Sequence, residues 1–294
     1  MKFSGSMTAL ITPFRDDAID EEALEKLVEY QLENGTSALV PCGSTGESAT
    51  LSHAEHVQVV QKVVAIAAGR VPVIAGTGSN STAEAIQLTT AARQAGADAA
   101  LLISPYYNKP TQEGIYQHYR QIAERTGMPL IVYNIPSRTG SKIAASTIAR
   151  LAELDGIVGL KEATGSLDEA QEVSRLCGDA IEIYSGDDSL TLPLIAVGAV
   201  GVISVVANVL PKQSSIAVQA ALAGDFARGR VEHFKMFPLM RALFLETNPI
   251  PVKAALAMMG FCNDELRLPL LPMTAGARET LRLALVDASV LEAD

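Results

Sequence analysis

Short apolar runs alternate with longer amphipathic runs along most of the chain, and this rhythm limits the possible folds more than any other feature. The apolar runs suited to strands are Ser6–Ile11, Ala38–Pro41, Val71–Ala75, Ala99–Ile103, Leu130–Tyr133, Ile157–Leu160, Ile181–Tyr184 and Gly201–Val205. They are continuous rather than alternating, as expected of parallel strands that are covered on both faces. Eight strand–helix units in about 220 residues favour an α/β protein, a (β/α)8 TIM barrel. An open doubly wound sheet is the alternative, because rhythm alone does not prove closure.

The amphipathic runs carry helix signals at their ends. Helices are predicted over Glu21–Asn34, His53–Ala68, Thr82–Ala95 and Gln112–Thr126. Three Ser-x-x-Glu sequences have the capping-box spacing that opens a helix, and they begin at Ser52, Ser81 and Ser166. Glycines stand where the helices should end, at Gly35, Gly69, Gly96 and Gly127. The predicted helix ends therefore agree with the alternation of apolar and amphipathic runs.

The strand signal fades after Gly224. Helices are predicted over Asp225–Glu246, Pro251–Gly260 and Ala275–Val290. No Ser/Gly-rich linker separates them from the preceding residues, so direct packing is expected. The predicted organisation is a catalytic barrel at residues 1–224 and a small C-terminal helical appendage at residues 225–294.

Composition and charge exclude several classes of partner. Hydrophobic residues make up 48% and charged residues 19%, which is ample apolar material for a core. The formal net charge of −10 would repel the phosphates of nucleic acids and anionic lipids. The apolar stretch Leu192–Leu210 has the length of a membrane span, but Pro193 and Gly198 interrupt it, which favours a helix end followed by a buried strand. We expect neither a nucleic-acid partner nor a membrane partner.

The cysteines and the N-terminus indicate a cytoplasmic protein. Cys42, Cys177 and Cys262 are far apart and odd in number, which is typical neither of a disulfide framework nor of a zinc site. The segment Met1–Gly5 lacks the apolar core of a signal peptide. Reduced, mostly buried thiols fit a reducing compartment.

Polar residues follow several of the predicted strands. In a TIM barrel the chemistry takes place at the C-terminal ends of the strands, so these residues should converge on one rim. The segments concerned are Gly43–Ser48, Ser104–Asn108, Tyr133–Gly140, Gly159–Glu162 and Ser185–Asp188. The doublet within the last segment has no third metal ligand nearby, so no metal site is predicted.

Lys161 closes an apolar strand and is expected to point into the mouth of the barrel. Desolvation lowers the pKa of an unpaired ammonium there and exposes the neutral amine that attacks a carbonyl. The alternative is a structural lysine paired with Glu162 or with a helix terminus.

Other rim residues have chemical and structural interpretations too. Tyr133 could transfer protons above an imine, or it could serve packing. Arg138 could hold a carboxylate with two hydrogen bonds, or it could be a solvated loop residue. The loop Gly43–Gly46 could cradle a carboxylate with its N–H groups, or it could be an ordinary turn.

Seven motifs together settle which family the chain resembles. They are Gly43–Ser48, Val73–Gly78, Pro105–Asn108, Tyr133–Gly140, Gly159–Gly165, Ser185–Asp188 and Asn248–Lys253. The chain resembles the dihydrodipicolinate synthase family, within the pyruvate lyase and aldolase superfamily that includes N-acetylneuraminate lyase. The resemblance spans nearly the whole sequence, from Gly5–Pro13 to Arg267–Leu270.

The resemblance implies a pyruvate-dependent Schiff-base enzyme. Lys161 would condense with pyruvate to an imine that tautomerises to an enamine. The enamine would attack L-aspartate 4-semialdehyde and give 4-hydroxy-tetrahydrodipicolinate, in the diaminopimelate and lysine pathway. No metal or organic cofactor is implied, because the imine itself is the electron sink.

The resemblance also assigns roles around Lys161. Tyr133 would transfer protons in a relay with Ser44 and Tyr107, the latter reaching in from a neighbouring subunit. The implied substrate-binding positions are Thr45, Arg138, Gly186 and Ile203. Arg138 would bind the carboxylate of the semialdehyde, and Thr45 and the backbone around Ile203 would hold pyruvate. The in-trans tyrosine implies at least a dimer, and the family suggests a homotetramer built as a dimer of dimers.

A second, regulatory site is implied at the subunit interface, where L-lysine inhibits sensitive family members. The matching positions are Ser48, Ala49, His53, His56, Asn80, Glu84 and Tyr106. Glu84 would pair with the ligand ammonium, although the same side chain could complete the capping box of its helix.

Ser44 departs from the family pattern, because the synthases usually have threonine there. The Ser-Thr pair resembles N-acetylneuraminate lyase, which makes sialate cleavage the alternative activity. Arg138 and Pro105–Asn108 favour the synthase instead. A non-catalytic small-ligand sensor on the same barrel is a further alternative. It would require the loss of Lys161 or Tyr133, and both residues are present.

Overall fold

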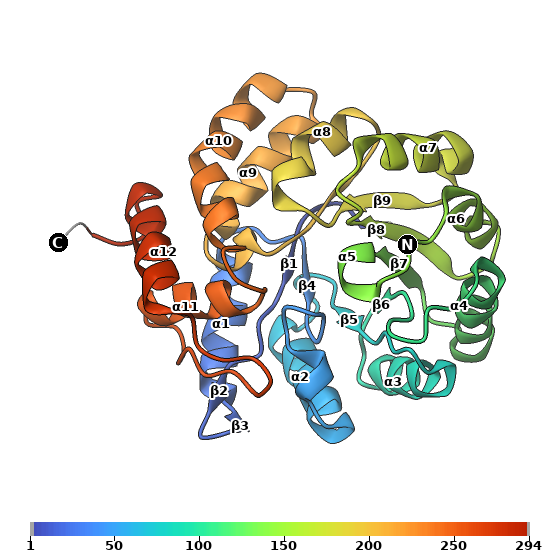
Figure 1. The fold of residues 1–294 in the computed structure, drawn as a ribbon, viewed down its shortest axis with the longest axis horizontal. Coiled ribbons are helices and arrows are strands. Elements are labelled where there is room, and N and C mark those ends of the chain that lie inside the picture. Colours follow the sequence, from blue (N-terminus) through green and yellow to red (C-terminus); the bar gives the residue numbers. More distant parts are fainter. Residues whose placement is uncertain (1–2, 293–294) are drawn as a thin grey trace.

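Eight parallel strands form one sheet in the computed structural model, which describes residues 3–292 (Figure 1). The strands are β1 (Gly5–Ala9), β4 (Ala38–Val40), β5 (Ile74–Gly76), β6 (Ala99–Ile103), β7 (Leu130–Asn134), β8 (Ile157–Glu162), β9 (Glu182–Ser185) and β10 (Gly201–Ser204). The hydrogen-bonded order is β4-β1-β10-β9-β8-β7-β6-β5. A parallel bridge between Leu39 and Val73 joins the two ends of this order. The sheet therefore closes into the predicted TIM barrel, and the open-sheet alternative is wrong.

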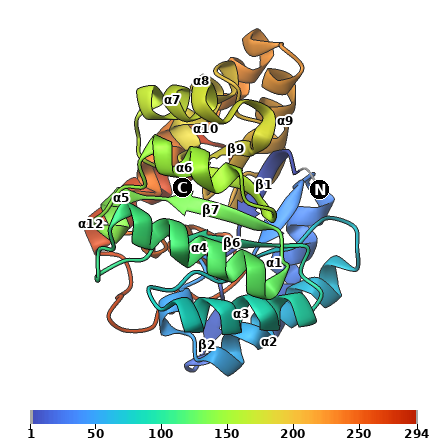
Figure 2. The same ribbon diagram turned by 90° about the vertical axis from the view of Figure 1, so that its right-hand side faces the viewer.

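Helices cover the outside of the barrel. They are α1 (Glu21–Glu33), α2 (His53–Ala67), α3 (Thr82–Gln94), α4 (Gln112–Thr126), α6 (Ala145–Ala152), α7 (Leu167–Cys177), α8 (Thr191–Ala196) and α9 (Pro211–Leu222). The short helix α5 (Pro136–Thr139) follows β7 at the rim. Figure 2 shows the side of the barrel along which α3, α4 and α6 lie. The four barrel helices predicted by range are confirmed to within a residue at each end.

The helix caps confirm one predicted capping box in full and two in half. At α2 the hydroxyl of Ser52 accepts from the Glu55 N–H, and the Glu55 carboxylate accepts from the Ser52 N–H at 2.8 Å. At α3 and α7 only the serine half forms. The expected reciprocal bonds are absent because Glu84 bonds Ser79 and His53, whereas Glu169 pairs with Lys142 at 2.6 Å.

Two apolar layers hold the barrel together. One lies between the strands and the surrounding helices. The other fills the interior with inward-facing side chains such as Met7, Ile74, Leu101, Ile131 and Ile203. Because strand residues alternate between the two layers, the residue that follows a helix-facing side chain points inward.

Three further helices follow α9. They are α10 (Phe226–Ala242), α11 (Ile250–Met258) and α12 (Ala275–Asp287). A third apolar cluster joins them to the barrel through Leu27 of α1 and Val205. In Figure 1, α10 lies along α9, and α12 lies on the outer side. The helical C-terminal region is thus confirmed, and the division at residue 224 stays a prediction.

The stretch Leu192–Leu210 has the organisation that the sequence predicts. Its first residues belong to α8, and β10 follows as a buried strand. Across residues 3–292, no helix has both the length and the apolar character that a membrane crossing requires.

A small antiparallel hairpin of β2 (Phe14–Arg15) and β3 (Ala18–Ile19) was not predicted. Its two turn residues, Asp16 and Asp17, have φ angles of 54° and 62°. This left-handed pair gives the turn a twist that matches the strands. The hairpin reaches across to the C-terminal region, where the carboxylate of Glu265 accepts from both turn N–H groups.

Candidate active site

Lys161 lies in the layer of side chains at the mouth of the barrel. In the strand register it stands beside Tyr133 of β7 and Tyr184 of β9, so all three side chains point inward. Its ammonium nitrogen lies 4.3 Å from the centroid of the Tyr133 ring. Lys161 is only 6% exposed and forms no ion pair within residues 3–292. Glu162 instead accepts from the Thr164 N–H at 2.6 Å, so the alternative of a Lys161–Glu162 pair is wrong.

Burial prepares the Lys161 amine for nucleophilic attack. Desolvation lowers the pKa of Lys161 to about 8, while Asp188 and Asp187 oppose the shift and Arg138 assists it. With that pKa roughly one tenth of the amine is neutral at pH 7, compared with well under one part in a thousand for an exposed lysine. The strand register therefore supplies both the position and the base form of a nucleophile.

Tyr133 is suited to giving up a proton only in concert with the reaction. Burial raises the pKa of its phenol, with Asp187 raising it further and Arg138 lowering it. The hydroxyl thus stays protonated at neutral pH. A protonated phenol beside the amine can donate to a departing oxygen and take the proton back later.

Asn248 ties two of the predicted substrate-binding residues together. Its side-chain Nδ2 donates to the hydroxyl oxygen of Thr45 at 2.9 Å. Its main-chain carbonyl accepts from Nη2 of Arg138 at 2.8 Å. Because the Thr45 oxygen already accepts one bond, its own proton is left to donate to a bound carboxylate.

The loop that carries Ser44 and Thr45 is held from below by a buried ion pair. Lys253 of α11 lies 2.5 Å from the carboxylate of Glu47, and the two side chains are 0% and 1% exposed. Glu47 itself has a left-handed φ of 54°. Its other carboxylate oxygen accepts from the Arg267 N–H at 3.2 Å. The loop is therefore fixed by residues from the far end of the chain.

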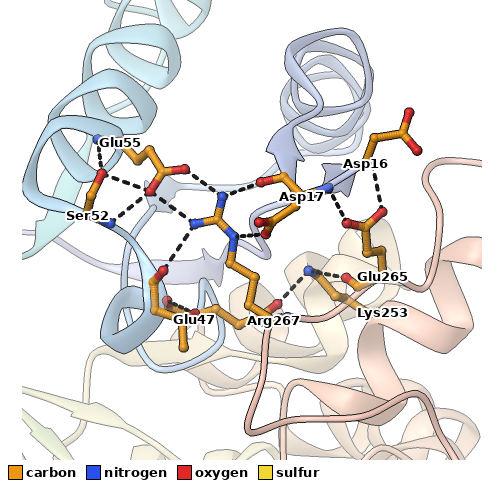
Figure 3. A network of polar contacts seen from close by, with 9 residues as sticks. Asp16, Asp17, Glu47, Ser52, Glu55, Lys253, Glu265 and Arg267 are labelled. Atoms are coloured by element: carbon orange, nitrogen blue, oxygen red, sulfur yellow. Dashed lines mark hydrogen bonds and ion pairs between the residues drawn. The ribbon is translucent and has the colours of Figure 1, made fainter.

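Figure 3 shows how the ion pair extends to the surface. Arg267 lies at the centre of the view, between the β2–β3 hairpin and the start of α2. Its guanidinium donates to Asp17 at 2.9 Å and to Glu55 at 2.5 Å. Both Lys253 and Arg267 also lie over the ring of Phe14, at 4.1 and 4.4 Å from its centroid.

A cavity of about 440 Å³ connects the rim with the predicted regulatory residues. Ser44, Arg138 and Asn248 line one part of it. Six of the seven predicted lysine-site residues line it as well, namely Ser48, Ala49, His53, His56, Glu84 and Tyr106. Asn80 does not, and its carbonyl accepts from Asn108 Nδ2 at 2.9 Å.

Glu84 is the acidic centre of these residues. Its carboxylate accepts from the Ser79 hydroxyl and lies 2.7 Å from Nε2 of His53. These two bonds, that of Ser79 first, lower the pKa of Glu84. His56 is buried against the carbonyl of Gly76 at 2.7 Å, and desolvation lowers its pKa. The group therefore presents a carboxylate that is already bonded to Ser79 and His53, in the cavity that His56 also lines.

The remaining predicted substrate positions are Gly186 and Ile203. A Cβ on Gly186 would lie 2.6 Å from that of Ala163 and 3.2 Å from Cε of Lys161, so only glycine fits there. Ile203 of β10 is fully buried and pairs in register with Met7. Gly186 therefore borders the lysine, and Ile203 lies in the barrel interior on β10, two strands away from β8.

Tyr107 is the one predicted catalytic residue that lies apart from the others. It is 89% exposed and has a left-handed φ of 67°. Within the described part of the chain, no hydrogen bond joins Ser44, Tyr133 and Tyr107 into a relay. A single chain therefore does not complete this predicted relay.

Sequence reasoning gave no role to Glu47 or to Asp187, and it gave none to Asn248 or Lys253. Each of the four nevertheless lies inside one of the motifs that carried the resemblance. The motifs therefore contained these residues, but the sequence did not show which residues they contact in the fold.

The chain matches known proteins over nearly its whole length. A family model described as "Dihydrodipicolinate synthetase family" matches residues 2–288. A curated protein of Pelobacter propionicus, named 4-hydroxy-tetrahydrodipicolinate synthase, is 54% identical, and the match covers 95% of this chain and 96% of the relative.

Two solved structures are similar in fold as well. The chloride-inhibited dihydrodipicolinate synthase of Acinetobacter baumannii, complexed with pyruvate, is 48% identical with a TM-score of 0.97, covering 99% of this chain and 100% of that one. A dihydrodipicolinate synthase of Cyanidioschyzon merolae with lysine bound is 40% identical with a TM-score of 0.95, covering 98% and 99%.

Proposed function

Because the chain belongs to the dihydrodipicolinate synthetase family, we propose that it is a 4-hydroxy-tetrahydrodipicolinate synthase. It condenses pyruvate with L-aspartate 4-semialdehyde through a Schiff base on Lys161. The observation that carries this proposal is the unpaired, buried amine of Lys161 beside the Tyr133 ring. Four curated relatives that are 54% identical or more carry the name of this synthase.

The first half of the reaction makes the enamine. The neutral Lys161 amine forms a C–N bond to the ketone carbon of pyruvate, and the ketone oxygen leaves as water after Tyr133 supplies a proton. Loss of a proton from the methyl carbon then gives the enamine. The Thr45 hydroxyl and the backbone near Ile203 and Gly186 hold the pyruvate carboxylate.

The second half makes and releases the ring. The enamine carbon forms a C–C bond to the aldehyde carbon, whose oxygen takes a proton to become a hydroxyl. The ammonium of the semialdehyde then loses a proton, and the resulting amine forms a C–N bond to the imine carbon. The C–N bond to Lys161 breaks as its nitrogen takes up a proton, and the Lys161 amine leaves. Arg138 holds the carboxylate of the semialdehyde, and Ser44 and a partner's tyrosine at position 107 carry protons to and from Tyr133.

Two measurements test the proposal together. Borohydride reduction in the presence of pyruvate should add mass to Lys161, whereas a sensor would give no adduct. Purified protein should then turn over pyruvate with L-aspartate 4-semialdehyde. Cleavage of sialate without synthase turnover would favour the lyase alternative. The presence of Arg138 argues against that alternative.

We also propose that L-lysine inhibits the enzyme at the cavity lined by Glu84. A lysine ammonium would be attracted to the Glu84 carboxylate, whose lowered pKa keeps it ionised. Titrating lysine into the synthase assay tests this. Glu84→Gln should weaken inhibition at least tenfold, while the exposed Glu113→Gln serves as the matched control. An unchanged rate at millimolar lysine would count against the site.

The proposed assembly is a homotetramer, a dimer of dimers in the cytoplasm. The strongly exposed Tyr107 supports a partner subunit at that surface.

A further inference from the structure

A second cavity lies at the mouth of the barrel and is lined by two residues of opposite charge that do not form an ion pair. It has a volume of about 710 Å³. Its lining includes Arg138 and Asp187, together with Ile135, Ala163 and Asn248. Within residues 3–292, Arg138 and Asp187 form no ion pair with each other. A guanidinium and a carboxylate held apart in one cavity are suited to a ligand that carries both opposite charges.

The carboxylate of Asp187 has no hydrogen-bond partner in the described structure. Its main chain is nevertheless fixed by Ser185. The Asp187 carbonyl accepts from the Ser185 hydroxyl at 2.7 Å, and the Asp187 N–H donates to the Ser185 hydroxyl oxygen at 3.3 Å. Asp187 is therefore a well-placed acceptor with unused capacity.

The other carboxylates near the cavity are already engaged. Asp188 accepts from the Ser204 hydroxyl at 2.6 Å and from the Val205 and Val206 N–H groups. Glu246, the other acidic residue in the lining, accepts from the N–H and the hydroxyl of Thr274.

A second free acceptor lies close by. Asn248 is 6% exposed, and its side-chain Oδ1 has no hydrogen-bond partner among the described residues. It lines the same cavity as Asp187 and Arg138. An ammonium has three donors, and an unpaired acceptor of this kind is costly to leave buried.

We propose that Asp187 recognises the ammonium group of the second substrate while Arg138 holds its carboxylate, with Asn248 Oδ1 as a further acceptor. This inference rests on the proposed function, because it assigns a binding role within that reaction. Asp187 is then a specificity-determining residue, which selects an aldehyde with an amine α to its carboxylate over an aldehyde that lacks the amine.

The electrostatics of the site agree with a zwitterionic ligand. Asp187 raises the pKa of Lys161, and Arg138 lowers it. A ligand whose two charges offset these residues adds no net charge beside Lys161. The second substrate can therefore bind without adding net charge beside the enamine that Lys161 has formed with pyruvate.

A substrate analogue isolates the ammonium contact. The probe is 4-oxobutanoate, which has the same aldehyde and carboxylate but hydrogen in place of the ammonium. For Asp187→Asn, the KM for L-aspartate 4-semialdehyde should rise about ten- to a hundredfold, the loss typical of a hydrogen bond to a charged group. The inhibition constant of 4-oxobutanoate should change by less than about twofold.

Controls separate recognition from structure. Glu113→Gln, at an exposed carboxylate outside the cavity lining, should leave both constants unchanged. Asp187→Glu should restore part of the lost selectivity. An equal loss for both ligands, or no loss for either, would overturn the inference. Should Asp187→Asn fail to fold, Asp187→Ser supplies the same comparison.

The proposed function has its own readout in the same experiment. Wild-type protein that does not turn over the semialdehyde overturns both proposals. Wild-type protein that does turn it over, with selectivity unchanged in Asp187→Asn, overturns only the role of Asp187. Borohydride trapping with pyruvate should remain efficient in the variant, because the first substrate carries no ammonium.

Discussion

At the scale of single residues, the chemistry depends on one lysine whose charge is disfavoured by its surroundings. A lysine amine attacks a ketone only as the neutral base, and burial lowers the pKa of Lys161 to about 8. The rate of imine formation with pyruvate should therefore rise about tenfold per pH unit below 8 and level off above it. Borohydride trapping from pH 6 to 10 measures this rate. A midpoint near that of an exposed lysine would contradict the role of burial.

The same burial lowers the stability of the folded protein. The pKa of Lys161 falls from 10.5 to about 8 on folding, so below pH 8 the buried ammonium costs up to about 3 kcal/mol. Between pH 8 and 10.5 the unfolded chain binds this proton and the folded chain does not, so the stability of the wild type rises with pH there.

Lys161→Met should thus abolish activity and stabilise the fold at pH 7. The gain should shrink as the pH is raised through the window between the two pKa values. Urea unfolding at pH 7 and pH 10 measures both free energies. The exposed Lys212→Met is the control and should change them little. Lower stability of Lys161→Met at pH 7 would contradict the prediction.

At the scale of elements, the segment from Asn248 through the first turn of α11 makes two contacts with the loop that carries Ser44 and Thr45. Asn248 holds Thr45, and Lys253 holds Glu47. Glu47→Gln leaves the Lys253 ammonium buried without its partner, so it should lower the free energy of unfolding by about 3–5 kcal/mol. Glu29→Gln, which breaks the exposed pair with Arg70, should change it little, because solvent screens that pair.

A double variant separates the structural role of this pair from its positioning role. Glu47→Gln combined with Lys253→Met removes both buried charges, and stability should largely return. The KM for pyruvate should stay raised severalfold, because the loop that carries Thr45 has lost its anchor. Recovery of KM together with stability would mean that the pair serves folding alone.

The elements differ in how well the sequence predicts them. Helix α4 follows from periodicity, because it buries one face that repeats along the chain, whereas β7 follows from a short continuous apolar run that is buried on both faces. The β2–β3 hairpin was missed because its two-residue strands are too short for a period. The role of Glu84 was ambiguous because its carboxylate could either complete the cap of its own helix or bind another partner. In the fold the carboxylate bonds His53 and Ser79.

The candidate site shows the same limit. Lys161 and Tyr133 could be predicted because their strand ends and motifs are local features. The pairing of Glu47 with Lys253 could not, because it depends on how the C-terminal helices pack against the barrel. The free carboxylate of Asp187 was also invisible, since sequence does not show which acceptors remain unused.

At the scale of the whole molecule, the proposed relay includes a residue that lies at the exposed surface of a single chain. Lys161, Tyr133 and Thr45 are buried at the rim, whereas Tyr107 is 89% exposed. An isologous dimer would place the Tyr107 of each chain against the partner, since a two-fold axis makes the contact reciprocal. The proposed relay therefore ties activity to assembly.

Mixing two inactive variants tests this reciprocity. Lys161→Ala and Tyr107→Phe each disable a different component, and a mixed dimer contains one site with both components intact. Random pairing makes about half of the dimers mixed, with one of two sites complete, so activity should recover to about a quarter of wild type. The matched control is Lys161→Ala with Tyr133→Phe. Both of these residues belong to the site of the same chain, so that mixture should stay at the level of the variants alone. No recovery with Tyr107→Phe would place the tyrosine outside the partner's site.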